Sequence, residues 1–177
     1  EGKPLLARKN PEGLLPPLFA WAEYNIYHKI GLKKRVREIM PILERYFTWV
    51  EQVYKQENGL YAVPLAATVM TNSPRQDMRY PIDFNTQVAI NALYMSALGD
   101  ILNDKEISYR YKKAYFSLKT RISSLMWNDQ DRLYYDLDKD EKQLKVKTAA
   151  SFWPLLAEIP NEVRAEGLIA HLTDPNT

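Results

Sequence analysis

Cysteine is absent from this 177-residue sequence, and histidine occurs only at His28 and His171. The lack of cysteine excludes a disulfide framework, a cysteine-ligated zinc site and a thiol nucleophile. It leaves the compartment open, because a cytoplasmic and a periplasmic or secreted location both suit a chain without thiols. The two histidines lie too far apart in sequence to belong to a metal-ligand motif.

The sequence also lacks a strong excess of charge of either sign. It has 24 basic and 22 acidic side chains and a net charge of +2, which argues against a nucleic-acid binder that neutralises phosphates. No apolar run approaches the roughly 18 residues of a membrane-spanning helix, and the N-terminus lacks the apolar core of a signal peptide. We therefore expect neither nucleic acid nor membrane as a partner, while Glu1 in place of Met suggests a processed or excised chain.

Hydrophobic residues make up 46% of the chain, and their spacing predicts an all-α protein. The apolar residues of 17–30 and 82–102 spread around most of the circumference, so we expect these two helices to be buried. In 34–57 and 106–127 they follow one stripe, which is typical of half-buried helices. Pro41 suggests a kink or a later start, and Gly31, Asn103 and Asn161 are typical of helix ends. The expected helices are 17–30, 34–57, 82–102, 106–127, 148–158 and 161–172.

These helices alternate between buried and half-buried, with a repeat of roughly 65 residues. The connection within each pair is short and the connection between pairs is long, so three helical hairpins would direct both long connections to the same end. This order predicts an arc of a double ring of helices. We call residues 58–81 the first rim loop and residues 128–147 the second rim loop. Residues 133–137 and 144–146 of the second rim loop are expected to form a short β-hairpin.

The first rim loop is too long for an ordinary connection but carries enough apolar residues to pack against the helices. These are Leu60, Tyr61, Val63, Leu65, Val69, Met70 and Tyr80. In its middle, Asn72 and Arg75 offer donors and an acceptor in fixed geometry, which suits a neutral ligand rich in hydroxyl groups. A plain turn is the alternative, because Asn-Ser-Pro is common in turns.

Five short motifs resemble a known family when they are taken in order. The resemblance is to the (α/α)6-barrel glycoside hydrolases that include trehalase, processing α-glucosidase I and mannosylglycerate hydrolase, and most of all to glycoside hydrolase family 63. It covers nearly the whole chain and implies about half of an (α/α)6 toroid, as one partial catalytic domain over residues 1–177. The motifs are PPLFAW (16–21), MTNSPR (70–75), IDFN (82–85), LYYD (133–136) and FWPL (152–155).

The resemblance implies an inverting glycosidase with one carboxylic acid and one carboxylate base. In the family the acid is the Asp of Ser-Gly-Met-Asp-Asn-Ser-Pro-Arg, and Thr71 occupies that position here. A threonine hydroxyl has too high a pKa to serve as a general acid near neutral pH. Val69 replaces the family's glycine, and the family's general-base Glu has no counterpart before Thr177. We therefore expect this chain to be inactive by itself.

The resemblance also implies residues that contact a sugar. Phe19, Trp21 and Trp153 would stack against its rings, although core packing is an equally good interpretation of these aromatics. Asn72 and Arg75 would contact its hydroxyl groups, while Leu15 stands where relatives often carry a sugar-contacting Gln. Two acidic residues are candidates to compensate for Thr71, namely Asp77 and Asp83, although Asp83 is better explained as a carboxylate at a helix N-terminus.

Four functions remain open from the sequence. The first is a piece of a glycosidase for α-glucosides or related oligosaccharides, and the second is a non-catalytic carbohydrate-binding relative. The third, a terpene cyclase or prenyltransferase toroid, lacks its Asp-rich metal motif and zinc cysteine. The fourth is a helical scaffold for a partner protein.

The sequence calls for no cofactor and no metal, since a calcium site at Asp129, Asp131 and Asp136 is less consistent with it than a solvated acidic loop. The expected partners are an oligosaccharide or small glycoside, together with the remainder of the barrel or another copy of the chain. The last expectation follows because both flanks of a half ring would expose apolar helices.

Overall fold

The computed structural model describes residues 14–68, 70 and 72–174. Val69 and Thr71 lie outside the described residues, so the effects expected of these two departures from the family pattern stay predictions. Within the described part of the chain, no helix is long and apolar enough to cross a membrane.

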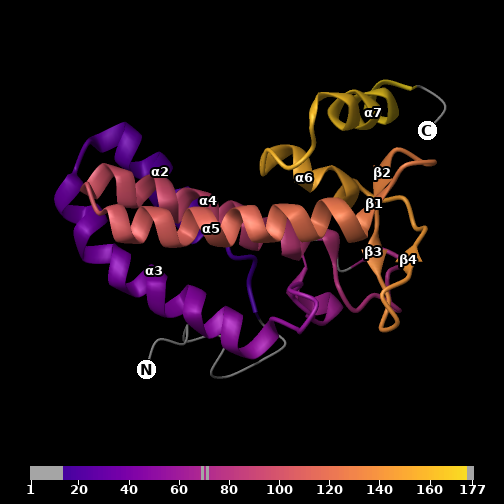
Figure 1. Ribbon diagram of the computed structural model, residues 1–177, viewed down its shortest axis with the longest axis horizontal. Helices are drawn as coiled ribbons and strands as arrows, with labels where there is room; N and C mark the ends of the chain where they lie inside the picture. The colour runs from indigo at the N-terminus through magenta and orange to yellow at the C-terminus, as the bar shows by residue number, and fades with distance from the viewer. Residues whose placement is uncertain (1–13, 69, 71, 175–177) are drawn as a thin grey trace.

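Three helical hairpins form about half of an (α/α) toroid, as predicted (Figure 1). The hairpins are α2–α3, α4–α5 and α6–α7. Helices α3 and α5 run in the direction opposite to α4, and the two rim loops lie at the end where α4 begins. The helices are α2 (Phe19–Ile30), α3 (Lys33–Tyr54), α4 (Ile82–Leu102), α5 (Lys105–Arg121), α6 (Trp153–Leu156) and α7 (Glu162–Thr173).

The three helix-end signals in the sequence are confirmed. Gly31 adopts a left-handed conformation with φ of 68°, and its N–H donates to the carbonyl of Tyr27 at 2.7 Å. Asn103 ends α4 in the same way with φ of 60°. The side chain of Asn161 accepts a hydrogen bond from the backbone N–H of Arg164 at 3.0 Å. Each residue satisfies backbone groups that the helix itself leaves unpaired.

Pro41 does not delay the start of α3, which begins at Lys33 and continues to Tyr54. The predicted later start is therefore wrong. The apolar stripe lies on both sides of the proline, with Val36 and Met40 buried before it and Leu43 buried after it. Packing of this stripe stabilises the helix despite the missing N–H.

Two predicted helices are shorter than expected. Residues 106–127 divide into α5 and a π-helix at Ile122–Met126. Residues 148–158 divide into a 3-10 helix at Ala149–Phe152 and α6. Pro154 explains the second break, because it has no N–H to donate to Ala150. The Ala150 carbonyl instead accepts from Trp153, three residues on, which is the 3-10 pattern.

Helix α4 is the centre of the fold and is buried around most of its circumference, as predicted. It packs against α2, α3, α5 and α6. The approach to α5 is close at Gly99, where a Cβ atom would lie 2.7 Å from the backbone nitrogen of Ser108. The hydroxyl of Ser96 donates to the Ser108 carbonyl nearby, at 3.0 Å. Small residues therefore allow the two backbones of this hairpin to approach closely.

Helix α2 is not buried, which corrects the prediction from its apolar composition. Ala20 is its only fully buried residue, whereas Phe19 is 40% exposed and Trp21 is 45% exposed. The backbone N–H of Ala20 donates to the side-chain oxygen of Asn91 on α4 at 3.0 Å. One side of α2 thus packs on the half ring, and no helix in the described part of the chain covers its exposed apolar residues.

The second rim loop forms two small antiparallel pairs of strands instead of one hairpin. Strand β3 (Asp136–Leu137) pairs with β4 (Gln143–Leu144), as predicted. Strand β2 (Leu133–Tyr134) was predicted to belong to the same hairpin, but it pairs instead with the preceding strand β1 (Trp127–Asn128). The side chain of Asn128 accepts from the Asp131 N–H at 2.8 Å and closes this earlier turn.

The two rim loops meet, as the hairpin arrangement predicts. Tyr80 and Leu137 form an antiparallel bridge, with N···O distances of 3.0 and 3.1 Å. The Asn58 amide donates to the Glu141 carboxylate at 3.0 Å. The first rim loop packs down as expected: Leu60, Tyr61, Val63 and Tyr80 are buried, and Leu65 and Met70 are partly buried.

Candidate active site at the rim

The NSPR segment of the first rim loop forms a tight local turn. The Ser73 hydroxyl donates to the Met70 carbonyl at 2.8 Å, and the Arg75 N–H donates to the Ser73 carbonyl at 2.8 Å. Asn72 and Pro74 are exposed, whereas Ser73 and Arg75 are buried. The turn therefore presents Asn72 outward and directs Arg75 into the protein.

Arg75 forms a buried ionic cluster with Asp83 and Asp136. Its Nε and Nη2 donate to the two carboxylate oxygens of Asp136 at 2.6 and 2.9 Å. Its Nη2 and Nη1 donate to the two oxygens of Asp83 at 2.9 and 3.2 Å. The three side chains are 1%, 0% and 6% exposed for Arg75, Asp83 and Asp136. We call these residues the Arg75 cluster.

Backbone groups complete the Arg75 cluster. Asp136 accepts from the N–H of Ile82 at 2.8 Å, and Asp83 accepts from the N–H of Phe84 at 3.0 Å. Both N–H groups belong to the first turn of α4, where a helix has unpaired donors and favours negative charge. Burial alone lowers the pKa of the Arg75 guanidinium. The hydrogen bonds and charges of Asp136 and Asp83 outweigh burial and raise this pKa above its ordinary value, so Arg75 is permanently charged.

The four polar residues that the sequence proposed for the site fall into a buried pair and an exposed pair. Arg75 and Asp83 are brought together, but four of the guanidinium's hydrogen bonds go to the two carboxylates and neither residue reaches the surface. Asn72 and Asp77 are exposed and free of this cluster. Asn72 is therefore available to a ligand, whereas Arg75 and Asp83 are engaged with each other.

Asp136 is the member of the cluster that the sequence did not reveal, since it was placed in the LYYD motif and among possible calcium ligands but not beside Arg75. The available signal was its position directly after the apolar run Leu133–Tyr135, where a carboxylate is buried and needs a cation. The other two proposed calcium ligands have different partners. Asp129 accepts from the Trp127 indole at 2.6 Å, and Asp131 pairs with Lys145 at 2.9 Å, which lowers the pKa of Asp131. Among the described residues no group of three or more candidate ligands could hold a metal ion.

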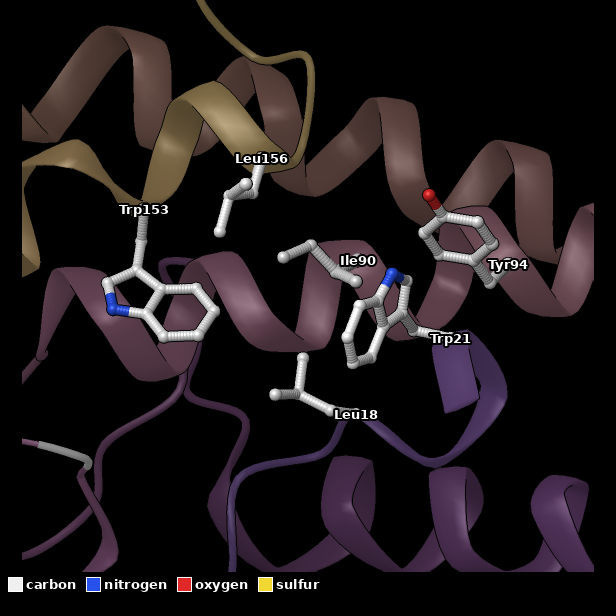
Figure 2. A pocket seen from close by; sticks show the side chains of 6 residues that line it. All are labelled: Leu18, Trp21, Ile90, Tyr94, Trp153 and Leu156. Carbon is white, nitrogen blue, oxygen red and sulfur yellow. The ribbon is translucent and has the colours of Figure 1, made fainter. Parts of the chain in front are cut away.

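Two of the three predicted stacking aromatics line the same cavity of about 240 Å³ (Figure 2). Trp21 comes from α2 and Trp153 from α6, and both rings lie beside Ile90 of α4. The third aromatic, Phe19, packs edge-on against Tyr46 with ring centroids 4.9 Å apart and does not line this cavity. The complete lining is Leu18, Trp21, Ile90, Tyr94, Trp153 and Leu156.

The cavity between the two tryptophans is almost entirely apolar. Only the indole N–H groups and the Tyr94 hydroxyl are polar side-chain groups of its lining. Neither Asn72 nor Arg75 lies among its lining residues. A second, more open cavity of about 580 Å³ lies between the end of the second rim loop and α7, with Lys147, Phe152 and His171 among its lining residues.

Solved structures with a similar arrangement of helices include two glycoside hydrolases. Family 63 mannosylglycerate hydrolase from Thermus thermophilus in complex with glucose has a TM-score of 0.78 at 19% identity, over 89% of this chain and 50% of that one. The family 78 rhamnosidase of Bacillus sp. GL1 has a TM-score of 0.83 at 15% identity, over 96% of this chain and 19% of that one. At these identities the likeness establishes the fold.

The sequence itself establishes the family. Residues 10–177 match the mannosylglycerate hydrolase MGH1-like glycoside hydrolase domain, and the chain belongs to this family. An uncharacterized protein of Borreliella burgdorferi is 51% identical over 168 residues, which are 95% of this chain and 35% of that protein. The chain thus spans about a third of this relative and half of the Thermus enzyme.

Proposed function

We propose that the chain is part of the single catalytic domain of an inverting glycoside hydrolase for small α-glycosides. Family membership carries this proposal. Structures of the related Thermus enzyme contain glucose in one case and Tris with D-glycerate in another. We therefore infer that the substrate class includes α-glucosides and glycosides of a small hydroxy acid.

The rim loops are the proposed position of the chemistry. Asn72 lies exposed on a turn that the Arg75 cluster anchors, next to the position where the resemblance places the general acid. We assign Asn72 a contact with sugar hydroxyls and Thr71 the position of the missing acid. Of the two compensating candidates, exposed Asp77 is favoured over Asp83, because Asp83 forms its ion pair in the interior.

The chain alone is expected to show no turnover. Inverting hydrolysis needs an acid and a base carboxyl roughly 6.5–9.5 Å apart, and Thr71 cannot supply the proton. The test is to incubate the purified chain with mannosylglycerate and with α-glucosides for a day and to measure the released free sugar by chromatography. Catalysis by the purified chain, proportional to its concentration, would contradict the assignment of Thr71 to the acid position.

Binding distinguishes this function from that of a helical scaffold. D-Glycerate or glucose should raise the unfolding temperature, because a ligand that binds only the native state stabilises it. Asn72→Ala should remove most of this shift, whereas Gln52→Ala, an exposed change on α3, should preserve it. Absence of any shift at millimolar ligand would favour the scaffold, and a shift without turnover also fits a non-catalytic sugar-binding relative.

The exposed apolar residues favour a partner that covers the flanks of the half ring. Val163 and Leu172 of α7 are 67% and 59% exposed, and Ile30 of α2, at the other end of the half ring, is 51% exposed. We propose that the remainder of a barrel or another copy covers them, since burial of such surface is favourable. The purified chain should therefore associate in light scattering, and a monodisperse monomer would count against this proposal.

A further inference from the structure

We infer that Arg75 is a positioning residue that fixes the NSPR turn on the rim, and that it does not contact the substrate. This inference rests on the proposed function and deepens it, because it explains what holds Asn72 in place. Arg75 is the only member of its turn that is both charged and buried among the described residues 72–78. An arginine suits this role because its planar fork can bind two carboxylates at once.

The hydrogen bonds of the turn show why it needs an anchor. Its backbone bonds are local: Ser73 donates to Met70, Arg75 to Ser73, and Met78 to Arg75. In the described part of the turn, residues 72–78, every hydrogen bond to another segment runs through the Arg75 side chain. The next link along the chain is the N–H of Arg79, which donates to Leu137 at 2.8 Å. Arg75 therefore ties the turn to the scaffold.

The two carboxylates come from the parts of the fold that the turn must be positioned against. Asp83 lies in the first turn of the central helix α4, and Asp136 lies in strand β3 of the second rim loop. One guanidinium thus joins both rim loops to α4. Because burial excludes water from the cluster, loss of the cation would leave two negative charges uncompensated, and the segments would separate to solvate them.

Hydrogen–deuterium exchange of the folded chain tests this role without any sugar. Arg75→Lys keeps the charge but loses the fork, so the amides of Ser73 and of residues 75–78 should exchange at least tenfold faster while those of α5 stay unchanged. Arg75→Met should produce a larger local increase, with faster exchange also at strand β3. The matched control is Arg110→Met, which removes the exposed 2.7 Å ion pair with Glu44 and should leave the turn unaffected.

Each outcome decides the question. A uniform increase along the chain would show that Arg75 supports only global stability, and unchanged exchange in the turn would show that it anchors nothing. Either result overturns the inference. If Arg75→Met fails to fold, Arg75→Lys carries the test. Because no substrate is involved, an absence of sugar binding would count against the proposed function and leave this inference intact.

Discussion

Replacing Phe84 with alanine should lower the free energy of unfolding by about 3–5 kcal/mol, the range for deletion of a fully buried aromatic ring. Phe84 is 0% exposed and lies in the first turn of α4. Helices α2, α3, α5 and α6 all pack on α4. The cost includes the lost transfer of the ring from water and the cavity that remains. Urea denaturation followed by circular dichroism measures it.

Phe116→Ala is the matched control, since it removes the same side chain from a helix surface. Phe116 lies on α5 and is 51% exposed, so the expected change is about 0.5 kcal/mol or less. Comparable losses for the two variants would mean that α4 is not the centre of the core. That result would contradict the half-toroid arrangement itself, because only there does α4 have neighbours on so many sides.

Asp136→Ala should lower the free energy of unfolding by about 3–5 kcal/mol, the range for breaking a buried ion pair. The change removes both carboxylate oxygens that accept from Arg75 and leaves the N–H of Ile82 without its acceptor. Arg75 would then have one buried carboxylate instead of two. The same denaturation experiment reports the loss.

Asp140→Ala, in the same rim loop, is the matched control for Asp136→Ala. Asp140 forms a 3.3 Å pair with Lys139, and both side chains are largely exposed. Water and salt screen such pairs, so the expected effect is about 0.5 kcal/mol or less. If Asp136→Ala is as mild as this control, the cluster contributes little, and the anchoring role of Arg75 fails with it.

The sequence by itself determined the helical architecture of this protein. The spacing of apolar residues and the residues that end helices are local properties of the sequence. They were enough to place the helix pairs, the ends at Gly31 and Asn103, and both long connections at one rim. The order of the motifs was enough to indicate the glycoside hydrolase family. These inferences succeeded because helix formation and capping depend on residues three or four apart along the chain.

Only the tertiary structure decided how the site residues are used. Arg75 and Asp136 are 61 positions apart, and no local pattern shows that they pair. The prediction that α2 is buried, made from its apolar residues, was wrong. Burial depends on which neighbours are present to cover a helix. The same holds for Trp21 and Trp153, which line one cavity although most of the chain separates them. Pairing and coverage are properties of the packed arrangement, and they distinguish the anchoring arginine from the exposed asparagine three residues before it.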